Sequence, residues 1–168
     1  RTRVLFLCET NAAWSLLAEA LLDRAGRERF QALSAGLFPA AAADPLALEA
    51  LVHARLDVEA VFPKSFAAFR EPGALPLDLL ITNLDLEPLG LASGWPGHPA
   101  LLHWNLPDPA KAPGDEAARR PALHRAFADL QNRVHLLLAL PPAKLDQLVD
   151  TGRRAAHPAP GESLLPAL

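Results

Sequence analysis

Cysteine is almost absent from this chain, which has one among its 168 residues. A single thiol excludes an intrachain disulfide and a structural zinc site built on several cysteines. Proteins of oxidising compartments commonly contain disulfides. The single cysteine of this chain therefore predicts a reducing compartment, most simply the cytoplasm. We also expect no secretory signal, since no small-residue cleavage site follows the short N-terminal apolar run.

Long apolar runs and an excess of positive charge are missing as well. Charged residues, Pro or His interrupt each apolar run before the ~20 residues that a membrane helix needs, so no membrane association is predicted. The formal net charge of -3 excludes an electrostatic footprint for nucleic acid. Hydrophobic residues make up 51% and charged residues 21%, as in ordinary globular domains. We predict one domain over residues 1–150 and a mobile Pro- and Ala-rich tail over 151–168.

Short apolar segments alternate along the chain with segments of helical composition. The expected strands lie at 4–7, 30–35, 77–84 and 100–104. The expected helices lie at 16–26, 44–56, from Pro121 to about 140, and at 144–149. Alternating strands and helices imply right-handed crossovers. We therefore predict an α/β fold, a small doubly wound four-stranded parallel sheet with helices on both faces.

The segment from Val4 to Ser15 joins an apolar strand, a polar loop and a helix start. Functional groups gather at the carboxyl ends of parallel strands, and Cys8 stands at such an end. Backbone N–H groups of a loop of this kind form an anion site, where a cysteine has a stabilised thiolate and acts as a nucleophile. Asn11 tolerates the left-handed turn, and Ser15 is placed to donate its hydroxyl to the sulfur. The alternative is that Cys8 is only a small buried hydrophobe.

Further short motifs follow Cys8, Asn11 and Ser15 in a fixed order along the chain. They are Ala18-Glu19-Ala20, Ser34-Ala35-Gly36, Lys64-Ser65, Pro96-Gly97-His98-Pro99 and the run from His103 to Ala110. As a set they resemble the low-molecular-weight protein tyrosine phosphatases and the arsenate reductases that share their fold, with agreement from about residue 3 to 140. The stretch 96–110 is similar to the arsenate-reductase-like branch.

This resemblance implies an enzyme that acts on a small oxyanion or a phosphomonoester. Cys8 would attack phosphorus or arsenic, and Asp108 would protonate the leaving oxygen. By itself, Asp108-Pro109 is typical of a turn. No cofactor or metal is expected, because His98, His103 and Asp85 match no ligand spacing. The oxyanion-binding loop that the resemblance implies comprises Glu9, Thr10, Asn11, Ala12, Ala13, Trp14 and Ser15.

The loop departs from the family pattern at three positions. Trp14 stands where the family has an arginine that clamps the anion, and an indole supplies one N–H, no charge and a ring able to fill the pocket. Glu9 adds a negative charge that we expect to raise the pKa of Cys8 and to repel an oxyanion. Ala12 replaces a loop serine, and no other Arg or Lys lies in the loop. These departures predict impaired catalysis.

Arsenate reduction would depend on an external low-molecular-weight thiol. Thioredoxin-linked members pass a disulfide to further cysteines, one of which follows the third strand, whereas residues 81–85 here contain no thiol. Two alternatives to the enzyme stay open: a non-catalytic binding, sensing or partner-interaction domain, and a redox-sensing thiol. The apolar stripe over 123–138 faces the core by default and leaves room for a homodimer contact.

Overall fold

The structure is a computed structural model that describes residues 1–156. Its four strands form one parallel sheet in the order β2-β1-β3-β4. The strands are β1 (Thr2–Cys8), β2 (Phe30–Gly36), β3 (Leu79–Thr82) and β4 (Ala100–His103). The helices are α1 (Trp14–Gly26), α2 (Pro45–His53), α3 (Glu116–Ala139) and α4 (Pro142–Ala156), with short 3₁₀ helices η1 (Phe66–Phe69) and η2 (Pro109–Lys111). The predicted α/β class and the four-stranded parallel sheet are confirmed.

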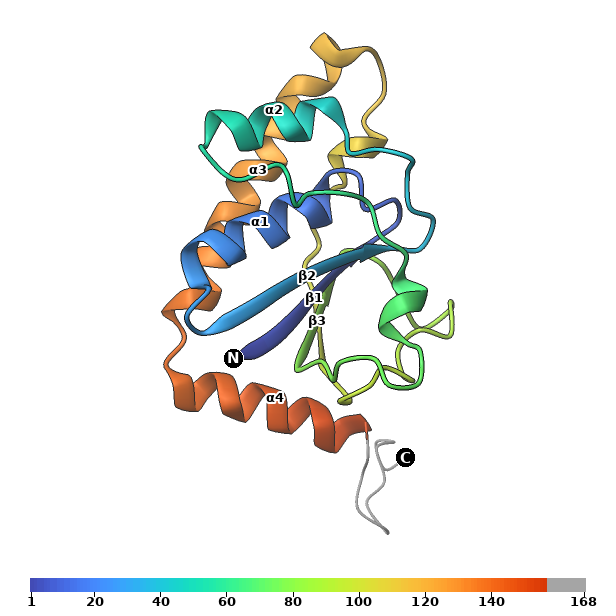
Figure 1. The fold of residues 1–168 in the computed structure, drawn as a ribbon, viewed down its shortest axis with the longest axis vertical. Coiled ribbons are helices and arrows are strands. Elements are labelled where there is room, and N and C mark those ends of the chain that lie inside the picture. Colours follow the sequence, from blue (N-terminus) through green and yellow to red (C-terminus); the bar gives the residue numbers. More distant parts are fainter. Residues whose placement is uncertain (157–168) are drawn as a thin grey trace, which may run out of the picture.

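The central strand β1 divides the core into two layers, because successive side chains of a strand point to opposite faces. Val4, Phe6 and Cys8 pack in the layer that also contains the buried side chains of α1, α2 and α3. These three helices lie on one side of the sheet (Figure 1). Leu5 and Leu7 face the opposite layer, which η1 and the loop 84–95 cover. All five side chains are fully buried, as expected for a strand in the middle of a covered parallel sheet. Among residues 1–156, no helix is long and apolar enough to cross a membrane.

Capping residues decide where two of the helices begin. The Asp44 side chain accepts from the Leu46 backbone N–H at 3.0 Å, and Pro45 takes the first helical position, so the predicted start of α2 is confirmed. The prediction for α3 is wrong at its start, since the helix begins at Glu116 and contains Pro121. Asp115 caps this earlier start by accepting from Ala118 N–H at 2.9 Å, which favours the additional turn despite the N–H that Pro121 lacks.

Helix α4 is longer than the sequence predicts, because tertiary contacts hold its last turns. The tail was expected to begin at Thr151, but the helix continues to Ala156. Arg153 donates to the Gly97 carbonyl at 3.0 Å and pairs with Asp78. Gly152 lies so close to Ala100 that a Cβ would overlap it. The predicted tail is therefore wrong over 151–156, and its remaining residues 157–168 lie outside the described part of the chain.

Candidate active site

The loop after β1 turns sharply and lies close against the end of β2. Asn11 adopts the left-handed backbone conformation expected of it, with φ +50°. The loop carbonyls of Cys8 and Glu9 accept from the backbone N–H groups of Leu37 at 3.1 Å and Phe38 at 2.7 Å. A Cβ on Gly36 would lie 2.8 Å from the Asn11 nitrogen, so only glycine permits this approach. These contacts fix the loop on the sheet edge.

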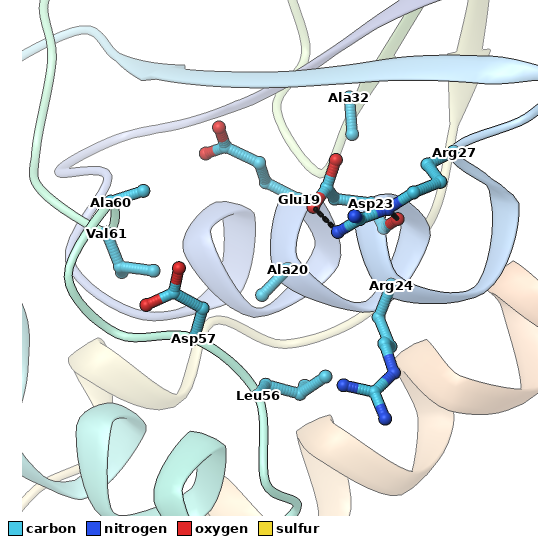
Figure 2. Close-up of a pocket in the computed structure, with 10 residues that line it drawn as sticks. All are labelled: Glu19, Ala20, Asp23, Arg24, Arg27, Ala32, Leu56, Asp57, Ala60 and Val61. Atoms are coloured by element: carbon cyan, nitrogen blue, oxygen red, sulfur yellow. Dashed lines mark hydrogen bonds and ion pairs between the residues drawn. The ribbon is translucent and has the colours of Figure 1, made fainter.

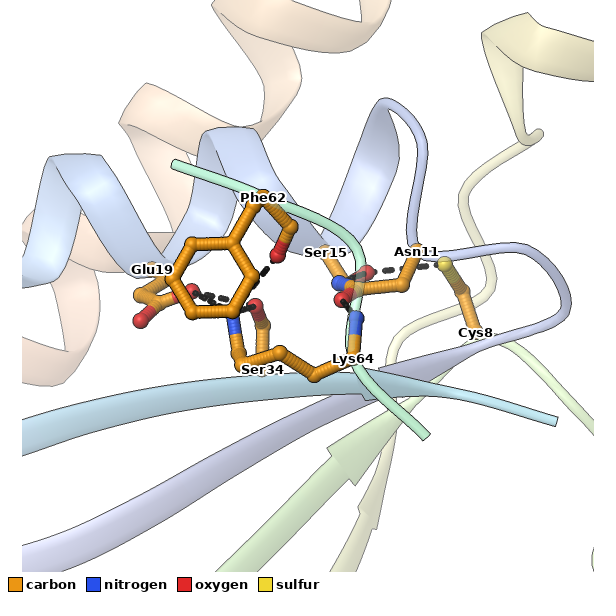
Figure 3. A network of polar contacts seen from close by, with 7 residues as sticks. All are labelled: Cys8, Asn11, Ser15, Glu19, Ser34, Phe62 and Lys64. Atoms are coloured by element: carbon orange, nitrogen blue, oxygen red, sulfur yellow. Dashed lines mark hydrogen bonds and ion pairs between the residues drawn. The ribbon is translucent and has the colours of Figure 1, made fainter. Parts of the chain in front are cut away.

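Three side chains of the loop form one hydrogen-bonded chain that ends at the sulfur (Figure 3). Cys8 Sγ lies 2.9 Å from Ser15 Oγ, and Asn11 Nδ2 donates to Ser15 Oγ at 2.7 Å. Asn11 Oδ1 accepts from the backbone N–H of Lys64 at 2.8 Å. A thiolate can only accept hydrogen bonds, so Ser15 donates whenever Cys8 is ionised. The arrangement therefore supports the thiolate from a fixed direction.

A second polar cluster holds the segment that carries Lys64 (Figure 3). Lys64 Nζ lies 3.4 Å from Glu19 Oε2, 3.3 Å from Ser34 Oγ and 3.0 Å from the Phe62 carbonyl. The Ser34 hydroxyl donates to Glu19. These bonds join α1, β2 and the segment 62–64 behind the loop. In the sequence, Glu19, Ser34 and Lys64 stand out only as members of the family motifs. Their contacts with one another could not be predicted, because they join residues far apart in the chain.

Burial dominates the electrostatics of Cys8, which is fully buried. Burial raises the pKa of the Cys8 thiol, and the nearby Asp108 carboxylate raises it further. The Ser15 hydroxyl and the backbone N–H groups of Ser15 and Asn11 lower that pKa, but they do not compensate. The direction of this shift is opposite to that of the stabilised thiolate which the sequence predicts. Glu9, expected to raise this pKa, has its carboxylate paired with Lys111.

Asp108 is both a turn residue and a neighbour of the thiol. Its side chain accepts from the Ala110 backbone N–H at 3.0 Å and so begins η2, as the turn interpretation predicts. Burial raises the pKa of the Asp108 carboxyl, the Glu9 and Asp44 carboxylates also raise it, and the Ala110 N–H and Lys111 lower it. The raised pKa keeps the Asp108 carboxyl protonated to a higher pH than an ordinary aspartate, which suits a general acid near a sulfur nucleophile.

Trp14 belongs to the core beneath the loop. Its ring is fully buried and meets both Phe6 and Trp104 edge-on, with centroids 6.4 Å apart and planes 74° apart in each pair. Within the described part of the chain, its Nε1 has no hydrogen-bond partner. The Trp14 indole is thus part of an aromatic cluster in the core with Phe6 and Trp104. The loop segment 8–15 contains no Arg or Lys of its own.

A pocket of about 350 Å³ opens between the loop and η2. It is lined by Glu9, Asn83, Leu84, Asn105, Leu106, Pro107, Asp108 and Lys111. The carboxyl ends of β1, β3 and β4 meet there, as expected for a site in a parallel sheet. Of the predicted site residues, Glu9 and Asp108 line this pocket, while Asn11, Ala12, Ala13, Trp14 and Ser15 are buried around Cys8. Sequence reasoning missed Lys111, whose only signal is its position three residues after Asp108.

A separate pocket of about 230 Å³ lies between α1, β2 and the segment 56–61 (Figure 2). Asp23, Asp57 and Glu19 line it together with Arg24 and Arg27. Arg27 pairs with Asp23 at 3.1 Å, so the charges that line the pocket partly neutralise one another. The pocket contains no residue of the Cys8 loop, so the candidate chemistry does not belong to it.

Comparisons with solved structures find proteins of the same fold. An arsenate reductase from Archaeoglobus fulgidus is 26% identical, covers 82% of this chain and 99% of its own, and has a TM-score of 0.62. A low molecular weight protein tyrosine phosphatase from T. tengcongensis (22% identity, 82% and 98% covered, TM-score 0.64) has the same fold. So does an arsenate reductase in its phosphate binding state (19% identity, 83% and 98% covered, TM-score 0.64).

A search of curated proteins finds no match to this chain. The family model for the low molecular weight phosphotyrosine protein phosphatases, however, matches residues 3–87, slightly more than half of the chain. The matched part contains Cys8, the whole loop and the cluster around Lys64. The protein therefore belongs to the low molecular weight phosphotyrosine protein phosphatase family.

Proposed function

We propose that the protein hydrolyses small phosphomonoesters slowly, with Cys8 as the nucleophile and Asp108 as the general acid. The observation that carries this proposal is the Cys8–Ser15 contact at 2.9 Å, which Asn11 fixes by donating to Ser15, with Asp108 near enough to raise the pKa of Cys8. Family membership and the shared fold support it. A cytoplasmic location belongs to the same proposal, because a lone nucleophilic thiol needs a reducing compartment.

The chemistry takes two steps. Cys8 Sγ attacks phosphorus, so that a P–S bond forms, the ester P–O bond breaks and the leaving oxygen takes the proton of Asp108. Water then attacks phosphorus and gives a proton to Asp108, and cleavage of the P–S bond releases phosphate and the Cys8 thiolate. The raised pKa of Asp108 favours the first of these proton transfers.

Two features make this turnover slow. The loop has no cation of its own, and the loss of a comparable arginine costs about 10³–10⁵ in rate in other phosphoryl-transfer enzymes. The raised pKa of Cys8 also reduces the fraction of thiolate at neutral pH. Both effects act on the transition state or the nucleophile, so kcat falls rather than binding alone.

Arsenate is the second substrate class compatible with the loop. The Cys8 thiolate would form an S–As bond while an As–O bond breaks and the leaving hydroxide takes the proton of Asp108 to become water, after which an external thiol would attack Cys8 Sγ. The S–As bond would break with both electrons on arsenic, giving arsenite and a mixed disulfide that a second thiol reduces. The chain's single cysteine requires those thiols to be external.

A non-catalytic binding domain is the alternative function, and the packing of Trp14 favours it. The indole lies in the core with Phe6 and Trp104, where it offers no charge to an anion. Such a protein would bind a small oxyanion or a partner at the loop without turnover.

The release of para-nitrophenol from para-nitrophenyl phosphate tests both functions. Cys8→Ser is the blank, Asp108→Asn removes the acid, and Trp14→Arg restores the family residue. Turnover that is lost in Cys8→Ser and lowered in Asp108→Asn supports hydrolysis. If the natural chain releases no para-nitrophenol but Trp14→Arg does, the result supports the binding function. If neither protein releases para-nitrophenol, the hydrolysis proposal is contradicted.

A further inference from the structure

An ion pair crosses the mouth of the candidate active site. Lys111, the last residue of η2, pairs through Nζ with Glu9 Oε2 in the loop. The two side chains are 58% and 36% exposed, so the pair lies in solvent reach. Both residues line the pocket of about 350 Å³ that also contains Asp108. The pair therefore borders the pocket that contains the Asp108 carboxyl, and its Glu9 is next in sequence to Cys8.

Lys111 also brings a positive charge to a site that otherwise has an excess of acidic groups. The hydrogen bond to Glu9 raises the pKa of Lys111, and the charges of Glu9, Asp108 and Cys8 raise it further. The ammonium thus interacts with the acid and the nucleophile as well as with its partner. Arg119, another cation near the loop, is held by Asp44, and both its side chain and that of Asp44 are largely buried. Lys111 is far more exposed than Arg119, so its side chain has more room to leave its partner.

We propose that Lys111 exchanges Glu9 for the oxyanion of the substrate and so binds it in the absence of a loop arginine. The ligand class is a small tetrahedral oxyanion with two negative charges, such as a phosphomonoester or phosphate. This rests on the proposed function, because it places the oxyanion at the Cys8 loop. Exposed ion pairs contribute little to stability, so breaking the Lys111–Glu9 pair costs little free energy. A lysine on a flexible four-carbon stem can follow the anion as a point charge.

Glu9 is the counterpart in this exchange. With Lys111 engaged, Glu9 competes with the ligand for the same ammonium and keeps it at the mouth when no ligand is bound. Removing the Glu9 charge should therefore strengthen anion binding, whereas removing the Lys111 charge should weaken it. If Lys111 exchanges partners, the two substitutions change anion binding in opposite directions. If the ion pair is only structural, both substitutions break it and change anion binding in the same direction.

Alkylation of the single cysteine measures this attraction directly. Iodoacetate carries a negative charge and iodoacetamide is neutral, and both form an S–C bond at Cys8 with loss of iodide. We expect Lys111→Ala to lower the ratio of the two rates by about three- to tenfold, and Glu9→Gln to raise it. Lys144→Ala removes an exposed charge on α4 and should leave the ratio unchanged. A ratio unchanged in Lys111→Ala, or lowered equally in Lys144→Ala, overturns the proposal.

Binding of inorganic phosphate provides the second measurement, in case the buried thiol reacts with neither reagent. The rise in Tm that phosphate causes should be lost in Lys111→Ala and increased in Glu9→Gln. An equal rise in all variants, or none in the natural chain, overturns the proposal. Neither readout needs turnover. A protein that fails to hydrolyse para-nitrophenyl phosphate but shows these effects refutes hydrolysis alone, and turnover without them refutes only the role of Lys111.

Discussion

Asn11 orients the Ser15 hydroxyl beside the Cys8 sulfur. Its Nδ2 donates to Ser15 Oγ at 2.7 Å, and its Oδ1 accepts from the Lys64 backbone N–H at 2.8 Å. One buried amide thereby satisfies partners on both sides of the loop, and its backbone tolerates φ +50°. The loop shape and the orientation of Ser15 depend on the same residue. Changing it should therefore affect stability and chemistry together.

Asn11→Ala should lower the free energy of unfolding by about 2–4 kcal/mol, because it leaves buried groups unpaired and strains a left-handed residue. Urea unfolding followed by tryptophan fluorescence measures the change. Asn83→Ala is the matched control, since the buried Oδ1 of Asn83 has no partner among the described residues and its loss should cost less. Equal losses in the two variants would contradict the role assigned to Asn11.

Ser15→Ala should raise the pKa of Cys8 further, because the thiolate loses the hydroxyl that lowers that pKa. The midpoint of the pH dependence of iodoacetamide alkylation should move upward. Ser93→Ala, in the loop that covers the opposite face of the sheet, is the control and should leave the midpoint in place. A midpoint that stays or moves downward in Ser15→Ala would show that Ser15 does not donate to the sulfur.

Asp108→Asn should raise the free energy of unfolding at pH 7. The pKa of Asp108 is raised in the folded state, so the native protein binds its proton more tightly than the unfolded chain. The natural protein therefore loses stability as pH rises from about 3.8, the ordinary pKa of the carboxyl in the unfolded chain, through its higher pKa in the folded state. The advantage of the variant is expected above that window and should vanish below it.

Urea unfolding between pH 4 and pH 7 follows this difference, with Asp146→Asn, exposed on α4, as the control. Asparagine keeps an oxygen that can accept from Ala110, so the start of η2 is preserved. An advantage that grows as pH falls would contradict the assignment.

Gly36→Ala should destabilise the protein by about 1–3 kcal/mol, since the added Cβ meets backbone atoms of Asn11 and Thr10 that cannot move aside. Thermal unfolding measures the loss. Gly26→Ala is a useful contrast, because the nearest atoms to its Cβ belong to the side chains of Leu138, Phe30 and Leu22. A smaller loss is expected there, where alanine also favours the helix. Equal losses would mean that the close approach of the loop to β2 is unimportant.

The local part of the site could be predicted from the sequence, because its determinants are neighbours along the chain. The strand before Cys8, the turn at Asn11 and the hydroxyl of Ser15 fall within one short segment, and the structure brings them together. The start of α2 was equally local, since Asp44 and Pro45 are adjacent.

The remaining features depend on contacts between distant segments. The pairing of Glu9 with Lys111 and the packing of Trp14 on Trp104 require the folded sheet to bring β1 and the segment after β4 together. The end of α4 could not be predicted either, because Arg153 finds its partners near the starts of β3 and β4. For Cys8, the sequence indicated the hydrogen bonds and left burial as the alternative, and only the structure shows that the thiol is fully buried and that burial has the larger effect on its pKa.

Asp78 joins three parts of the chain at the amino end of the sheet. Its carboxylate accepts from the backbone N–H of Arg3 at 2.8 Å and pairs with Arg153, and its carbonyl accepts from Ala100 N–H at 3.0 Å. The strands β1, β3 and β4 and the last described helix are thus fastened at the end remote from the thiol. The strand register is therefore fixed at one end of the sheet by Asp78, while the residues that line the candidate site all follow the carboxyl ends of the strands at the opposite end.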